Sequence, residues 1–202
     1  EPARGESEAR SSDEPQPPLI DVIRYLWGKK TFLHLSAAAP LLVSSFYCLN
    51  IWGPAFLIRV HDLTTADVGI RLGPIMGLGG AAGTLAGGYV CDRLGRRDVR
   101  NYLRVPGAAA IGMIPFLVLF LLAPETNTAL LSLIPMVVLA ATFIAPIYTV
   151  ALGLARLHMR AMSSALIHLV TSMVGAGVAP QIVGISNDML APTFGPEAVR
   201  YS

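Results

Sequence analysis

The stretch "GGYVCDRLGRRD" (residues 87–98) carries five charged side chains within seven residues, directly after twenty residues that carry none. The uncharged segment before the charges, Leu72–Cys91, is rich in glycine and in apolar side chains. About twenty consecutive apolar residues are enough for a helix to cross the hydrocarbon core of a bilayer. The abrupt change at Asp92 therefore predicts the point at which a transmembrane helix leaves the membrane.

The composition of the whole chain agrees with this interpretation. Of its 202 residues, 53% are hydrophobic and only 14% are charged, and the mean hydropathy is +0.58. A soluble domain carries about 25% charged residues, which it needs for a polar surface. The composition excludes most classes of soluble protein and predicts a membrane protein.

Four more long uncharged runs flank the first one on either side. Backbone groups in lipid must be hydrogen-bonded within the protein, so runs of this length predict helices, and the short alternating strands of a membrane barrel are not seen. The expected fold is an all-α membrane protein with five transmembrane helices. The expected spans are residues 31–60, 66–91, 101–124, 128–155 and 161–187.

The flanking segments have different compositions. Residues 1–18 are charged and rich in proline, which is typical of a disordered linker. Residues 19–30 place apolar side chains on one helical face, which predicts either a helix in the membrane interface or an extension of the first span. Residues 191–202 are expected to be a periplasmic segment that precedes a missing last helix.

The basic residues divide unevenly between the two sides of the predicted bundle. If the N-terminus is cytoplasmic, twelve basic residues lie inside and three lie outside. The inside set is Arg4, Arg10, Arg24, Lys29, Lys30, Arg93, Arg96, Arg97, Arg100, Arg104, Arg156 and Arg160, and the outside set is Arg59, Arg71 and Arg200. The positive-inside rule therefore predicts that the N-terminus is cytoplasmic.

Small residues recur at helical spacing in two of the spans. Gly79, Gly83 and Gly87 form a stripe in the second span, and Gly175, Gly177 and Gly184 lie in the fifth. Such stripes allow the backbones of membrane helices to approach closely. We expect the second and fifth spans to touch each other, so that the segment 88–92 faces the segment 160–163.

The motif at the end of the second span resembles the signature loop of the major facilitator superfamily, approximately G-x-L-A-D-R-x-G-R-R. The matching residues are Gly88, Asp92, Arg93, Gly95, Arg96 and Arg97, whereas Val90 and Cys91 differ from the pattern. The resemblance implies a twelve-helix transporter with two six-helix halves. Because the loop follows the second span after a polar linker, the chain resembles helices seven to eleven of the C-terminal half. Its expected partners are the missing N-terminal six-helix half and the missing last helix.

Three further stretches are similar to bacterial spinster-like transporters: "NIWGPAFLIRVHDLTTADVG" (residues 50–69), "LHMRAMSSA" (157–165) and "APQIVGISND" (179–188). Relatives in that branch move lysophospholipids and sphingolipids. The resemblance implies a secondary active transporter of a small organic or lipid-like solute that works by alternating access in the bacterial inner (plasma) membrane. The alternative is a self-contained five-span assembly or receptor protein without transport activity.

The charged motif has two interpretations. The matched residues, together with Arg160, are expected to form a conformational latch, because Asp92 can face the positive N-terminal end of a neighbouring helix and the arginines can pair with acids or lipid phosphates. Alternatively, the charges only determine the topology of the chain. Anionic lipid headgroups are the expected partners, and nucleic acid is not expected.

Polar residues inside the spans are the candidates for solute binding, since such residues face the bundle interior or a water-filled cavity. The candidates are Tyr47, Asn50, Tyr148, Thr149, His168, Thr171 and Ser172. For the serine and threonines the alternative is a hydrogen bond to their own helix, and for Asn50 and His168 it is a bond between helices. No catalytic group, metal or cofactor is expected, because no set of paired carboxylates or matched acid and base is present in the sequence.

Overall fold

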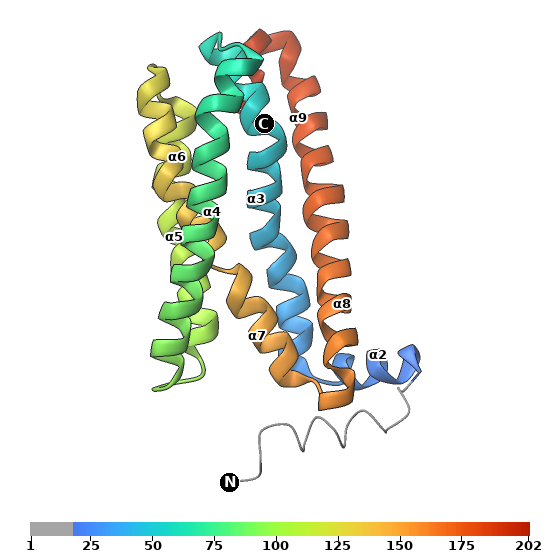
Figure 1. Ribbon diagram of the computed structural model, residues 1–202. Helices are drawn as coiled ribbons and strands as arrows, with labels where there is room; N and C mark the ends of the chain where they lie inside the picture. Colours follow the sequence, from blue (N-terminus) through green and yellow to red (C-terminus); the bar gives the residue numbers. More distant parts are fainter. Residues whose placement is uncertain (1–17) are drawn as a thin grey trace.

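The computed structural model describes residues 18–202, and in this range the chain is a bundle of helices without strands (Figure 1). Of the predicted linker, residues 1–18, only Pro18 falls in the described range. The elements are α2 (Leu19–Trp27), α3 (Lys30–His61), α4 (Thr65–Gly95), α5 (Asn101–Leu122), α6 (Thr126–Ala141), α7 (Ile144–Leu154), η1 (Leu157–Met159), α8 (Arg160–Ser172), η2 (Met173–Val178), α9 (Ala179–Phe194) and η3 (Gly195–Arg200).

Four helical segments in the described range are long and apolar enough to cross a membrane: Lys30–His61, Asn101–Leu122, Thr126–Leu154 and Leu157–Arg200. The helix α4 has 31 residues and is also long enough, but its many glycines lower its hydropathy and it is not among the four. It nevertheless runs beside the other long helices over their whole length (Figure 1). The prediction of an all-α membrane bundle is confirmed.

The long helices run alternately up and down, so that the connections gather at two ends (Figure 1). One end holds α2, the α4–α5 connection and the α7–α8 connection, and we call it the arginine end. The opposite end holds the α3–α4 and α5–α6 connections and η3. The sequence dictates these turns locally: Thr64 caps α4 by accepting a hydrogen bond from the amide of Asp67 (3.2 Å), and Asp62 ends α3 in the left-handed region (φ 52°).

The predicted fourth span is divided into two helices, α6 and α7, at Thr142 and Phe143. Pro146 explains the break, because a proline has no N–H to donate to the carbonyl four residues earlier and its ring crowds that carbonyl. The carbonyl in question belongs to Thr142. The backbone N–H of Thr142 donates to the carbonyl of Leu139 (3.2 Å), and the Thr142 hydroxyl donates to the carbonyl of Val138 (3.0 Å). The chain can therefore change direction inside the membrane while most backbone groups keep partners.

The last long helix is continuous in space but irregular in its middle. Over Met173–Val178 it widens into a π-helix, which ends two residues before Pro180. The widened turn is the local response to a proline that cannot complete the normal hydrogen-bond ladder. The indole N–H of Trp52 on α3 donates to the carbonyl of Pro180 (3.0 Å), which ties the irregular segment to α3.

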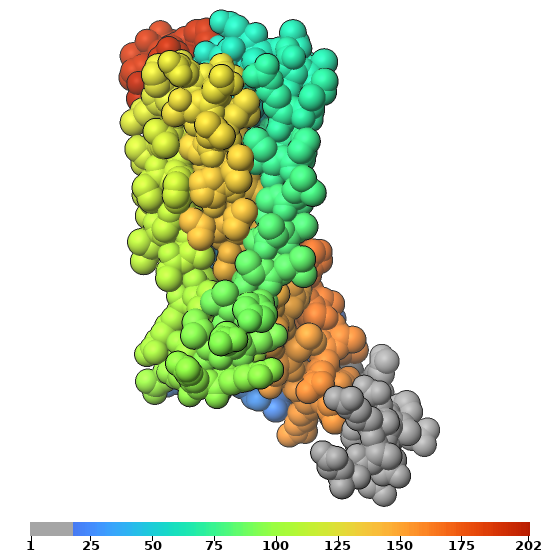
Figure 2. Space-filling model, turned by 60° about the vertical axis from the view of Figure 1, so that its left-hand side comes forward, coloured from blue at the N-terminus to red at the C-terminus, as the bar shows by residue number. Residues whose placement is uncertain are grey.

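The glycine stripe of α4 packs on the backbone of α6. A Cβ atom at Gly83 would collide with the carbonyl oxygen of Val138, and one at Gly87 with that of Thr142. Gly79 lies beside Val137, where an added Cβ would be 3.1 Å from Cγ1. Figure 2 shows α6 seated between α4 and α5. The absence of side chains lets α4 lie directly on the carbonyls at the α6–α7 break, with Cα–H groups facing the oxygens.

The expected contact between the two glycine-rich spans is wrong. Two of the three fifth-span glycines face α3 instead: Gly175 lies against Val43 and Tyr47, and Gly184 lies against Trp52. The helix α7 packs against both α4 and α8 and fills the space between them (Figure 1). A small-residue stripe permits close approach to any helix, so the sequence alone does not determine which helix it meets.

The short helix α2 is docked firmly at the arginine end. Val22 and Leu26 are fully buried against Phe32 and Met159. The ammonium group of Lys29, which follows α2, donates to the carbonyl of Leu154 at the C-terminus of α7 (2.7 Å). A cation at this position also interacts favourably with the helix dipole. On its outer side α2 exposes Ile20 and Trp27, as expected for a helix at the membrane surface.

Adding a single methyl group on α4 tests the packing against α6. We expect Gly83→Ala to destabilise the folded protein by about 1–3 kcal/mol, because its Cβ meets a backbone carbonyl that cannot move aside. The matched control is Gly80→Ala, where an added Cβ meets nothing within 4 Å. It should leave stability unchanged or raise it by up to about 1 kcal/mol through helix propensity. The midpoint of thermal unfolding in detergent measures both, and equal effects would contradict the packing.

Candidate functional site

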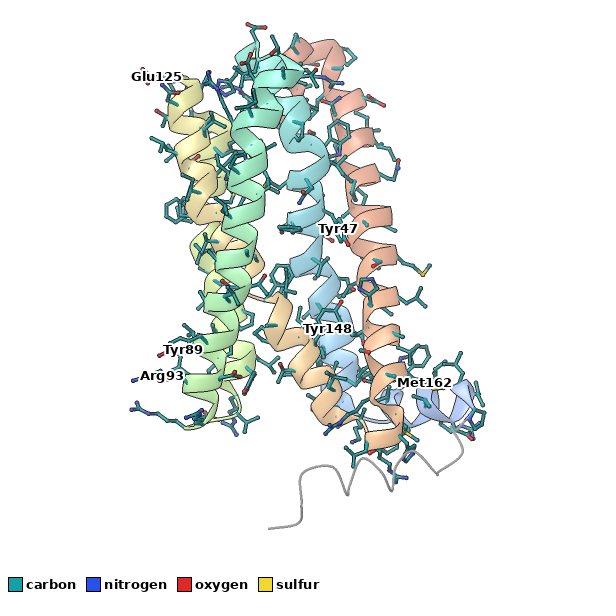
Figure 3. All side chains as sticks on the ribbon, viewed as in Figure 1. Tyr47, Tyr89, Arg93, Glu125, Tyr148 and Met162 are labelled. Carbon is teal, nitrogen blue, oxygen red and sulfur yellow. The ribbon has the colours of Figure 1, made fainter. Side chains whose placement is uncertain are left out.

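A cavity of about 150 Å³ lies between α3, α7 and α8, and it collects several of the predicted site residues. Figure 3 shows Tyr47 on α3 and Tyr148 on α7, the two tyrosines among its lining residues. The lining residues are Val43, Phe46, Tyr47, Phe143, Ile144, Ile147, Tyr148, His168 and Thr171. The wall is therefore largely apolar and aromatic, with a few polar groups, which is the usual composition of a site for a small molecule.

The polar centre of this cavity is a hydrogen bond between two helices. The hydroxyl of Tyr148 on α7 lies 2.8 Å from Nδ1 of His168 on α8, and the ring centroids are 6.4 Å apart. His168 is exposed and Tyr148 is half-buried. Which group donates depends on the tautomer of the imidazole. In either tautomer the other imidazole nitrogen of His168, Nε2, can form a hydrogen bond with another molecule.

Two more predicted residues complete the polar lining. The hydroxyl of Thr171 is buried and donates to backbone carbonyls of its own helix, at Ile167 (2.8 Å) and His168 (2.9 Å). It can still accept a hydrogen bond but has no free donor. The hydroxyl of Tyr47 makes no hydrogen bond to any residue in the range 18–202, so it can both donate and accept.

The three remaining candidates do not line the cavity. Asn50 is exposed, and its amide donates to the carbonyl of Phe46 in its own helix (2.8 Å). Thr149 is also exposed and bonds the carbonyl of Ala145 (3.0 Å). Ser172 is half-buried but lies outside the lining. For Asn50 and Thr149 the structure thus shows a bond to their own helix rather than a contact with the cavity.

Both irregular helix segments border the cavity. Phe143 and Ile144 line it at the α6–α7 break, and Thr171 lines it just before the π-helix. Gly175, inside the π-helix, lets α3 approach at Tyr47. Sequence reasoning missed the apolar lining residues. The signal that could have pointed to the place is the pair Pro146 and Pro180, since prolines in membrane helices mark where regular geometry is interrupted.

A second cavity, of about 320 Å³, lies toward the opposite end, and none of the predicted solute-binding residues lines it. Its wall is formed mainly by α3, α5 and the C-terminal segment at η3, and its aromatic residues are Trp52, Phe56 and Phe120. Within the described range, no group of three or more His, Cys, Asp or Glu side chains is arranged to hold a metal ion.

The predicted latch residues gather at the arginine end, but not as the sequence led us to expect. Gly88 faces Ala145 of α7, where an added Cβ would be 3.6 Å from the alanine Cβ. Arg93 lies beside the Tyr89 hydroxyl (3.3 Å), and both point away from the bundle (Figure 3). Arg96 and Arg97 are exposed in the connection that follows.

The segment 88–92 does not face the start of α8, so that expectation is wrong. Arg160 is exposed at the first turn of α8, and Ser163 donates to the carbonyl of Ala151 on α7 (2.9 Å). The reason is the break after α6, which turns α7 into the space between α4 and α8 (Figure 1). The carboxylate of Asp92 instead accepts a hydrogen bond from the Tyr102 hydroxyl on α5 (2.8 Å).

The arrangement of helices and the charged loop agree with a comparison against protein families. The family model described as "Major Facilitator Superfamily" matches residues 1–180 of the chain. The chain belongs to the major facilitator superfamily. The match confirms the resemblance seen in the signature loop. Members of this family are integral membrane transporters rather than enzymes.

Among curated proteins, an "MFS-type efflux pump" of Mycolicibacterium smegmatis is 28% identical over 174 residues. The match covers 86% of this chain and 40% of the relative. The chain therefore spans well under half the length of the curated relative that it matches.

Two solved structures share the fold, both of a bacterial homologue of the human lysosomal transporter Spinster in inward-facing conformations. The unoccupied form has a TM-score of 0.79 and 23% identity, with 90% of this chain and 39% of the other covered. The occupied form has a TM-score of 0.70 and 23% identity, with 84% and 39% covered. The expected resemblance to spinster-like members thus extends to the three-dimensional fold.

The contact between Gly175 and Tyr47 can be tested by enlarging the glycine. We expect Gly175→Val to lower stability by about 1–3 kcal/mol, because even a Cβ there would be 3.1 Å from Val43 and 3.3 Å from the Tyr47 ring. The control is Gly177→Val, at an exposed position of the same π-helix where the nearest atom is 3.9 Å away. Thermal unfolding in detergent compares the two. A loss that is as large at Gly177 as at Gly175 would contradict the contact.

Proposed function

We propose that this chain is part of a secondary active transporter that moves a small organic or lipid-like solute by alternating access. The cavity between α3, α7 and α8 forms one wall of its solute-binding site. Tyr47, Tyr148, His168 and Thr171 supply the polar contacts. The observation that carries the proposal is the interhelical hydrogen bond between Tyr148 and His168 in an otherwise apolar cavity.

The chemistry of the cavity supports a particular kind of solute. Its lining has aromatic and aliphatic side chains, two tyrosine hydroxyls, one imidazole and one threonine, and no Asp, Glu, Lys or Arg. A strongly charged solute would lose its hydration there without gaining an opposite charge. An apolar or amphipathic solute with a hydrogen-bonding group fits better. This chemistry is compatible with the efflux pump and the Spinster homologue that the chain resembles.

The irregular helices support alternating access. Transporters of several folds build their binding sites beside interrupted helices, because an interruption lets one part of a helix move relative to the other. Here the α6–α7 break and the π-helix η2 flank the same cavity. A solute bound by Tyr148 and His168 contacts α7, which follows the first interruption, and α8, which precedes the second. Its binding energy can therefore bias their relative position.

The charged connection at the arginine end supports the latch. Asp92, Arg93, Arg96 and Arg97 are all exposed there, in and just after the last turn of α4, and α4 packs against α7. We assign this end to the cytoplasm, by the positive-inside rule, and the membrane to the bacterial inner membrane. The six-helix N-terminal half and a last helix are the partners needed to complete the carrier.

The Tyr148 hydroxyl is the first group to remove. In the complete carrier, reconstituted in liposomes, we expect Tyr148→Phe to lower uptake of a fluorescent lysophospholipid probe roughly fivefold, since one hydrogen bond is worth about 1 kcal/mol. His168→Ala should lower it at least as much. The matched control is Tyr201→Phe, because that exposed tyrosine lies at the opposite end and packs on Phe194.

The outcomes separate the proposal from its alternative. Loss of transport in Tyr148→Phe, with normal transport in Tyr201→Phe, supports the site. Transport that is unchanged in both Tyr148→Phe and His168→Ala overturns this cavity as the site. If the unmodified carrier moves neither the lysophospholipid nor ethidium, a small organic cation, a membrane assembly or receptor without transport activity becomes the better assignment.

The orientation is tested by labelling from outside the cell. In a carrier without other cysteines, we expect Glu125→Cys to react with a membrane-impermeant maleimide in intact cells, because Glu125 is exposed at the end opposite the arginines (Figure 3). Arg97→Cys, at the arginine end, should react only after the cells are permeabilised. The reverse pattern would show that the N-terminus is not cytoplasmic.

A further inference from the structure

The connection between α4 and α5 is held in one conformation by side chains from the start of α5. The amide of Asn101 donates to the carbonyl of Leu94 (2.9 Å). Asp98 accepts from the backbone N–H of Arg100 (2.9 Å) and pairs with the Arg104 guanidinium (3.2 Å). The five residues between the two helices therefore have little freedom, and the side chains on either side of them have fixed relative positions.

Tyr102, on α5, contacts two residues of the charged motif, Asp92 and Gly95. Its hydroxyl donates to Oδ1 of Asp92 at 2.8 Å. Its ring lies directly on Gly95, so closely that a Cβ atom there would collide with ring carbon Cε2 and would be 2.9 Å from Cδ2. Gly95 thus has a steric reason to be glycine. Any larger residue would push away the ring that reaches Asp92.

The carboxylate of Asp92 is hydrogen-bonded by a tyrosine although arginines lie close to it in the sequence. Three arginines follow within five residues, yet the ion pair found in the described part of the chain joins Arg104 to Asp98 instead. Within residues 18–202, the side-chain partner of the Asp92 carboxylate is the neutral hydroxyl of Tyr102, which occupies one oxygen. The other oxygen, Oδ2, accepts no hydrogen bond from these residues, so an exposed negative charge is left available for a partner.

We propose that Tyr102 is a positioning residue of the conformational latch. It orients the Asp92 carboxylate so that Oδ2 points to the latch partner, and the ring keeps the end of α4 against the start of α5 through Gly95. This inference rests on the proposed function, because a latch has meaning only in a protein that alternates between two conformations. It adds a residue that lies outside the recognised motif and that no sequence pattern identified.

The test measures how often the arginine end is open in the complete carrier. The reporter is Ile144→Cys, which lies in the cavity, in a carrier without other cysteines. Its reaction rate with an impermeant maleimide is measured in inside-out vesicles. We expect Tyr102→Phe to raise this rate roughly fivefold, because losing a hydrogen bond of about 1 kcal/mol weakens the latch that closes this end. Gly95→Ala should act in the same direction, and Tyr201→Phe should not change the rate.

The decisive comparison combines Tyr102→Phe with Asp92→Asn. If Tyr102 acts through Asp92, the double variant reacts at the same rate as Asp92→Asn alone, since coupled residues are not additive. Additive effects, or a Tyr102→Phe variant that reacts like the unmodified protein while Asp92→Asn reacts faster, would overturn the assignment of Tyr102. If Asp92→Asn itself has no effect, the latch in the proposed function fails, and Tyr102 has nothing to position.

Discussion

The close approach of α4 to α6 is the contact on which the rest of the bundle depends. Gly83 and Gly87 lie on the carbonyls of Val138 and Thr142, with no side chain between the two backbones. These carbonyls lie at and just before the point where Pro146 interrupts the helix. The glycine stripe of α4 therefore packs against the break between α6 and α7. In a lipid environment, where no hydrophobic force drives helices together, such van der Waals packing is a main source of stability. It positions α7 beside α4, and α7 in turn carries Tyr148 into the cavity.

The need to satisfy backbone groups in lipid explains why the irregular segments lie in the protein interior. Two prolines, Pro146 and Pro180, remove N–H donors from membrane helices, and in both cases a side-chain hydrogen bond holds the backbone close to the interruption. The hydroxyl of Thr142 bonds a neighbouring carbonyl, and the Trp52 indole bonds the carbonyl of Pro180. Unpartnered carbonyls facing lipid would cost several kcal/mol each by the usual estimate of about 2–7. The interruptions are therefore tolerated only where other helices surround them, and the small cavity between α3, α7 and α8 lies at the same place.

The accuracy of the sequence-based predictions followed the range of the interactions involved. The helical character of the spans and the charged turn after Cys91 depend on composition and on neighbours within a few residues, and they agree with the structure. The cavity was predicted in part: Tyr47, Tyr148, His168 and Thr171 line it, whereas Asn50 and Thr149 bond their own helices. The partner of each glycine stripe was predicted wrongly. Tyr102 was missed because its two contacts, with Asp92 and Gly95, depend on how the connection folds back.

By itself, the sequence determined that this chain is a bundle of membrane helices with most of its basic residues at one end, because the hydrophobic length of a span and the cost of burying charge are properties of short segments. The signature loop also identified the family. Only the tertiary structure decided that α6 and α7 separate, that α7 lies between α4 and α8, and that a tyrosine and a histidine twenty residues apart share one hydrogen bond. Those features depend on which helix faces which. In lipid, that choice is made by the fit between whole surfaces, and no single stretch of sequence encodes it.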